Sequence, residues 1–356
     1  MSRYARLEVM REHVVFENKR AKIINKKRRR HIARRVSIED VPGFRVTNRD
    51  IEIVKAVYAY RALTTPQIER LLFPPDNRQD HPTKTSRCQH RLKLLFHAQY
   101  LCREEQPQRL SDGRKPLLHF LDENGAQLLA RVGEIERSRI AWKRKDNRVS
   151  PMFLEHLLAT NDVRIAVSLA ARRLGMTLER WLDEKTLKSK AVKDYVEVVL
   201  KDKNGHNCQR KKLAVVPDGY FVLSLGGRRG HFFLEIDLAT EPGKRWADKV
   251  RGYLAYLESG LYQKRYQTRS LRVLTVTTGP KRLENLRQTT QAVGGGSLFW
   301  FTTLALAQPA TVLSDAIWQR ARMEGLHSLI ERPSPKHPGH GELTPRTAPV
   351  VVFPPP

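Results

Sequence analysis

Residues 213–239 have the sequence LAVVPDGYFVLSLGGRRGHFFLEIDLA, and their pattern defines the second half of the chain. Two apolar runs flank the turn GGRRG at 226–230, which predicts adjacent strands at 213–225 and 231–239. Side chains two apart in a strand share a face, so Glu235 and Asp237 point the same way. Burying two neighbouring carboxylates without a partner is costly. The pattern therefore predicts a cation beside them.

Asp218, in Pro217-Asp218-Gly219, lies on the neighbouring strand and is the third acid of this group. Because the three acids offer oxygen ligands only, we expect Mg²⁺ or Mn²⁺, which could activate water for phosphodiester cleavage. The alternative is structural: Pro-Asp-Gly is an ordinary turn, and Asp237 caps or pairs with a nearby cation, Arg245 or Lys249.

The segments around this stretch alternate between strand and helix patterns. Strands are expected near 177–182, 194–200, 271–277 and 297–302, helices at 151–174, 242–259 and 280–291, and a basic loop at 201–212. Strands that come first and then alternate with helices predict an α/β (α+β) domain with a mixed central sheet.

Residues 46–132 show helical periodicity followed by a hairpin pattern. Thr47 with Asp50 predicts a first helix start, and a threonine cap before Pro66 predicts a second. A third helix is expected at 84–98, and extended segments at 99–104 and 116–121 flank a turn, with a last helix near Asp122. Three helices and a hairpin predict a winged helix-turn-helix.

The third helix of this unit has an apolar and a polar face. The apolar face, which is expected to be buried, carries Cys88, Leu92, Leu95 and Phe96, and the polar face carries Ser86, Arg87, His90, Lys93 and His97. We expect Ser86, Arg87, His90 and Lys93 to bind double-stranded DNA, with Arg114 from the hairpin turn. A winged helix used for protein contacts is the alternative.

The charge of the chain indicates a polyanionic partner. Lys and Arg number 65 against 37 Asp and Glu, a net charge of +28. Ten of the seventeen residues at 19–35 are basic, and this arm is expected to contact phosphates through Lys26, Lys27, Arg28, Arg29 and Arg30. Residues 188–212 add positive charge beside the Asp218 strand. A solvated charge run is the alternative for both segments.

Several function classes are not supported. No apolar window is long enough for a membrane helix, and the N-terminus lacks a signal-peptide core, so a cytoplasmic, nucleoid-associated protein without a membrane partner is expected. Cys88, Cys102 and Cys208 are far apart, which argues against zinc. The glycines at 226–230 and 294–296 do not open helices, so no nucleotide cofactor is expected.

Composition and pattern suggest five segments. These are a basic arm (1–45), a winged helix-turn-helix (46–132), a linker (133–150), an α/β domain (151–331) and a proline-rich tail expected to be disordered (332–356).

Two resemblances follow from these motifs. Asp218 followed by Glu235-x-Asp237 on adjacent strands resembles the PD-(D/E)xK nuclease superfamily, which implies a restriction-endonuclease-like domain and a catalytic set of Asp218, Glu235 and Asp237. The lysine expected two residues after Glu235 is absent, and Lys249 on the following helix resembles the relocated lysine of some members. The order LTTPQIERLLF, LEHLLATNDVRIA, PDGYF, FFLEID and KVRGYLAYLESG, over about 46–305, resembles the replication-relaxation family.

Together these patterns support two hypotheses and a third possibility. The first is a Mg²⁺- or Mn²⁺-dependent endonuclease or nickase acting on plasmid or mobile-element DNA, with Asp218 and Glu235 as metal ligands. The second is a non-catalytic DNA-binding accessory or recruitment factor, which the missing strand lysine favours, attached to a larger nucleoprotein machine. RNA binding is the third class.

Overall fold

The computed structural model describes residues 35, 44–73, 84–107, 113, 115–201 and 208–330. The expected DNA contacts Lys26, Lys27, Arg28, Arg29, Arg30 and Arg114 lie outside the described residues, as do nearly all of the arm and the whole of the tail at 332–356. The chain forms two compact units, 1–161 and 162–356. The segment boundaries inferred from the sequence remain predictions.

The first unit contains the expected order of three helices and a hairpin. The elements are α2 (Asn48–Tyr60), β1 (Leu63–Thr64), α3 (Thr65–Leu72), α4 (Lys84–His97), β2 (Leu101–Glu104), β3 (Leu118–Leu121) and α5 (Glu123–Val132), followed by short 3₁₀ turns η3 (Arg137–Arg139) and η4 (Arg144–Asn147). The strands form an antiparallel sheet in the order β1-β3-β2. Thr47 and Asp50 form the predicted capping box at the start of α2.

Helix α4 has the predicted division into a buried and an exposed face. Cys88, Leu92, Leu95 and Phe96 are buried, whereas Ser86, His90 and Lys93 are exposed and Arg87 is half-buried. The expectation of an outward-facing His97 is wrong: this residue is buried at the end of α4, with its ring against Phe96. Burial, with Arg103, Lys93 and Arg35 nearby, lowers the pKa of His97.

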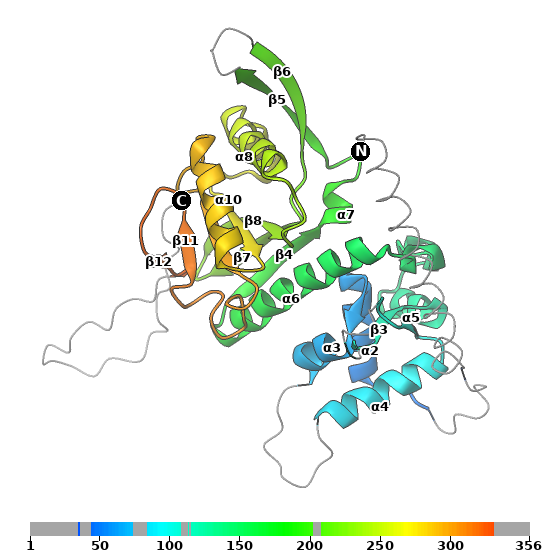
Figure 1. Cartoon of the computed structure of the whole chain (residues 1–356). Helices are drawn as coiled ribbons and strands as arrows, with labels where there is room; N and C mark the ends of the chain where they lie inside the picture. The colour runs from blue at the N-terminus through cyan, green and yellow to red at the C-terminus, as the bar shows by residue number, and fades with distance from the viewer. Residues whose placement is uncertain are drawn as a thin grey trace, which may run out of the picture. The chain divides into compact units, whose positions relative to one another are not determined.

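The second unit is built on a mixed seven-stranded sheet in the order β12-β11-β10-β9-β8-β7-β4 (Figure 1). Its strands are β4 (Thr177–Asp183), β7 (Gly219–Leu225), β8 (Arg228–Asp237), β9 (Arg272–Thr277), β10 (Phe299–Thr303), β11 (Trp318–Arg320) and β12 (Leu326–His327). Its helices are α7 (Glu184–Leu187), α8 (Gly243–Glu258), α9 (Leu261–Tyr266) and α10 (Pro280–Ala292), and α6 (Pro151–Arg173) contains the unit boundary. Strands β8, β9 and β10 are parallel and the other pairs antiparallel, which confirms the mixed α/β class.

The basic segment before Asp218 differs from the prediction. Strand β5 (Asp194–Lys201) pairs with β6 (Cys208–Val215) in a separate antiparallel ribbon, so residues 208–212 are strand rather than loop. The single strand expected at 213–225 is also wrong: its first residues belong to β6, Pro217 and its neighbours at 216–218 interrupt it, and only β7 pairs with β8. In β6 the exposed Arg210 and Lys212 alternate with more buried neighbours. This alternation of burial with a period of two is typical of a strand. The sequence does not show it, because Arg210, Lys211 and Lys212 are all charged.

One face of the large sheet packs against α8 and α10. Phe233, Trp246, Tyr253, Phe299 and Phe301 belong to one buried cluster on that face. The alternation of β8 therefore places Glu235 and Asp237, which share the face of Phe233, under these helices.

No helix among the described residues is long and apolar enough to cross a membrane.

Candidate active site

Strand pairing brings Asp218 and Glu235 together. The register sets Gly219 opposite Leu234, so Asp218 lies beside Glu235. The backbone N–H of Asp218 donates to the Leu234 carbonyl at 3.0 Å, and the N–H of Ile236 donates to Asp218 Oδ2 at 2.8 Å. Only 6% of Asp218 and 1% of Glu235 is exposed. The two carboxylates are therefore fixed to backbone geometry and largely shielded from water.

Helix α8 supplies two hydrogen-bond donors to Glu235. Lys249 Nζ lies 2.9 Å from Glu235 Oε2, and the Tyr253 hydroxyl donates to Oε1. Because residues four apart on a helix share a face, one helix edge carries both donors. Lys249 Nζ also lies 3.5 Å from Glu241. Asp218, Glu235 and Lys249, which come from separate elements, thus meet at one place, as the resemblance implies.

Burial disfavours the charged form of Glu235. Burial raises the pKa of Glu235 from 4.5 to about 7; Lys249 opposes this rise and Asp218 adds to it. Burial alone would lower the pKa of Lys249, but the carboxylates of Glu235, Asp218 and Glu241 outweigh it and raise that pKa. The ammonium group therefore remains charged beside a carboxyl group whose pKa is raised, and perturbed pKa values of this kind are common at functional sites.

Asp237 shares the strand face of Glu235 but has a different partner. Two nitrogen atoms of the Arg282 guanidinium group donate to it: Nε to Oδ1 at 2.8 Å and Nη2 to Oδ2 at 2.7 Å. Thr277 Oγ1 and the N–H of Ala239 also donate to Asp237. Burial raises the pKa of Asp237, but the hydrogen bonds from Arg282 and Ala239 outweigh it, so the pKa is lowered. These contacts give Asp237 a structural partner; its catalytic role remains a prediction.

The candidate metal ligands near Glu235 are oxygen atoms. Asp218 and Glu235 place two carboxylates side by side. Among the residues that the structure describes, no three His, Cys, Asp or Glu side chains gather as a metal-binding cluster. Thr275, the register partner of Glu235 on β9, has a buried Oγ1 without a hydrogen-bond partner in the described part of the chain. Mg²⁺ commonly takes one or two protein carboxylates and completes its shell with water.

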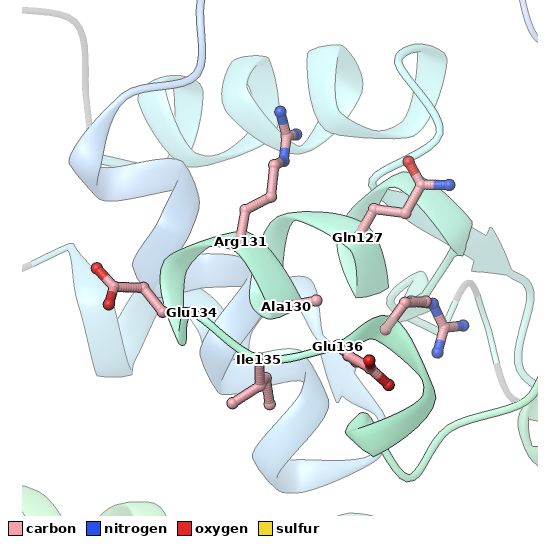
Figure 2. Close-up of a pocket in the computed structure, with 7 residues that line it drawn as sticks. Gln127, Ala130, Arg131, Glu134, Ile135 and Glu136 are labelled. Atoms are coloured by element: carbon pink, nitrogen blue, oxygen red, sulfur yellow. The ribbon is translucent and has the colours of Figure 1, made fainter.

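A separate hollow lies in the first unit. It has a volume of about 700 Å³ and is formed by the end of α5 and the segment after it. Figure 2 shows the residues that line it. The labelled side chains of Gln127, Arg131 and Glu134 point in different directions and do not converge. None of the predicted site residues lines this hollow.

The fold and this site define a mixed α/β protein with a buried aspartate, a buried glutamate and a half-buried lysine at the junction of β7, β8 and α8. A family model described as replication-relaxation matches residues 54–271. The chain belongs to the replication-relaxation family.

Two solved structures show a weaker likeness. The structure of restriction endonuclease FokI shares 10% identity with a TM-score of 0.26, and FokI bound to DNA shares 11% identity with a TM-score of 0.23. Each match covers 74% of this chain and 45% of the other, so the chain spans less than half the length of FokI. TM-scores this low do not establish a shared fold. No curated protein matches the sequence.

Proposed function

We propose that this protein binds double-stranded DNA and cuts or nicks it with Mg²⁺ or Mn²⁺ in plasmid or mobile-element DNA processing. The observation that supports this most is that Asp218 and Glu235 lie side by side on paired backbone, with Lys249 of α8 within reach of Glu235. An acidic pair with one lysine is suited to phosphodiester chemistry, since the acids hold a cation and the lysine faces the phosphate.

Each residue has a distinct proposed role. Asp218 and Glu235 hold the metal ion, which when bound supplies positive charge and lowers the pKa of a coordinated water. Glu235 would act as a ligand in its ionised form, with Tyr253 orienting the carboxylate through the hydrogen bond to Oε1. Lys249 stabilises the negative charge that develops on the phosphate.

DNA binding is assigned to the basic surfaces. We propose that the first unit is a winged helix-turn-helix whose α4 presents Ser86, Arg87, His90 and Lys93 to the major groove. The exposure of Ser86, His90 and Lys93 and the net charge of +28 support this role, as does membership of a family named for replication and relaxation. We place the protein in the cytoplasm with the nucleoid, where a larger nucleoprotein machine is the proposed partner.

Incubation of supercoiled plasmid with the full chain tests the proposal. With Mg²⁺ or Mn²⁺ we expect conversion to open-circular or linear DNA. EDTA should stop this conversion, because it removes the divalent ion that the proposed reaction requires. An intact plasmid at every protein and metal concentration would contradict cleavage.

The second candidate function is a non-catalytic DNA-binding factor. It is favoured by one observation: both oxygens of Glu235 already accept hydrogen bonds, from Lys249 and Tyr253. A protein of this kind would retard duplex DNA in a gel and leave supercoiled plasmid intact. Preference for RNA over duplex DNA in the same gel would instead indicate an RNA-binding protein.

A further inference from the structure

The β5–β6 ribbon stands apart from the seven-stranded sheet, with α8 beside it (Figure 1). One face of the ribbon is covered. Val196, Val198 and Leu213 pack into the cluster that contains the apolar side of α8, and Lys211 Nζ lies 2.6 Å from Asp248 Oδ2 on that helix. The ribbon is therefore anchored to α8 by apolar packing and an ion pair.

The other face of the ribbon is exposed and basic. Its side chains include Tyr195 and Val199, which are 47% and 53% exposed, and their register neighbours on β6 include Arg210. The ammonium groups of Lys193 and Lys212 each lie 5.0 Å from the centre of the Tyr195 ring. The ring therefore holds two cations at this surface.

Charge and shape suit duplex DNA. The described part of this face carries three basic residues, Lys193, Arg210 and Lys212. It carries one acid, Glu197, which lies opposite Lys212 in the register. Strands of eight residues span about 27 Å at 3.4 Å per residue. The major groove of B-DNA admits a two-stranded ribbon, and its phosphates attract such cations.

The ribbon is also linked to the candidate site. Asp248, which binds the ribbon through Lys211, is followed on α8 by Lys249, which binds Glu235. At its other end β6 leads through residues 216 and 217 into Asp218. One helix and one short connection therefore set the position of the ribbon relative to the acidic site.

We propose that the exposed face of the β5–β6 ribbon binds duplex DNA. This inference rests on the proposed function, since it concerns the DNA that the site would process. Arg210 and Lys212 contact phosphates, and Tyr195 keeps Lys193 and Lys212 at the surface.

Duplex-DNA binding by the full chain over a salt series tests the ribbon. We expect Arg210→Ala with Lys212→Ala to weaken binding at least about tenfold near physiological salt, and to reduce the slope of log K against log salt by about 2, the change for two lost phosphate contacts. The control is Arg172→Ala with Arg322→Ala, which removes the same charge from exposed positions in α6 and after β11. This control should retain wild-type affinity within about twofold.

Three results would overturn the inference, and they separate it from the proposed function. If the wild type binds DNA and the ribbon variant shows the same affinity and salt slope, the ribbon proposal alone fails. If both double variants weaken binding equally, only net charge matters and the ribbon is not a specific surface. If the wild type does not bind duplex DNA, both proposals fail. Matching thermal melting curves of variant and wild type exclude misfolding as the cause of weaker binding.

Discussion

Glu235→Gln is expected to lower the rate of metal-dependent plasmid cleavage at least about 100-fold, equivalent to about 2.7 kcal/mol of transition-state stabilisation. Glutamine keeps the size of the side chain but has no negative charge to hold a divalent ion. The fold should tolerate it, because glutamine still accepts a hydrogen bond and Lys249, which is 28% exposed, keeps Glu241 as an acidic partner. Cleavage rates at saturating protein, together with DNA affinity, measure the effect.

Glu241→Gln is the matched control, because Glu241 also contacts Lys249, at 3.5 Å. It should leave the cleavage rate within about threefold of wild type. If Glu235→Gln cleaves as fast as wild type, Asp218 and Glu235 do not hold a catalytic metal ion. If both variants lose activity equally, the charge balance around Lys249 is responsible rather than a ligand at Glu235.

Arg282→Ala is expected to destabilise the second unit by about 3 kcal/mol. Removing one partner of a buried ion pair costs about 3–5 kcal/mol because the other charge stays buried, and the lower value applies since the Arg282 side chain is 20% exposed. The effect should shrink on acidification: the lowered pKa of Asp237 contributes stability at higher pH that is lost as pH falls through this pKa. Chemical denaturation at two pH values measures both.

A second substitution identifies the cause of this loss. Asp237→Asn in the Arg282→Ala background removes the unpaired charge, so the double variant should be more stable than Arg282→Ala alone. Additive losses from the two changes would show that charge burial is not the reason. The neighbouring exposed Lys281→Ala should have a small effect, within about 0.5 kcal/mol.

Short-range patterns in the sequence predicted much of the fold. The capping box at Thr47 and the buried positions of α4 depend on local periodicity, and both are confirmed. The hairpin around the turn at 226–227 is confirmed for 219–225 and 228–237, but not for 213–218. The meeting of Asp218 and Glu235 also follows from local rules, because a hairpin fixes which residues stand side by side.

The parts that were not predicted depend on contacts between elements far apart in the chain. Asp237 pairs with Arg282, which lies forty-five residues further along the chain. The sequence spacing alone favoured the nearer cations Arg245 and Lys249 as its partners. Tyr253 lies one helical turn after Lys249, a spacing that could have indicated a second donor to Glu235. The position of Thr275 beside Glu235 depends on the parallel register of β8 and β9, which the sequence does not specify.

Anomalous diffraction from crystals of the protein with Mn²⁺ tests the metal site most directly. We expect one anomalous peak within about 2.3 Å of a carboxylate oxygen of both Asp218 and Glu235, with Lys249 Nζ moved away from Glu235 Oε2. No peak at saturating Mn²⁺, with Lys249 and Tyr253 still bound to Glu235, would contradict the metal-dependent site and favour the non-catalytic DNA-binding factor.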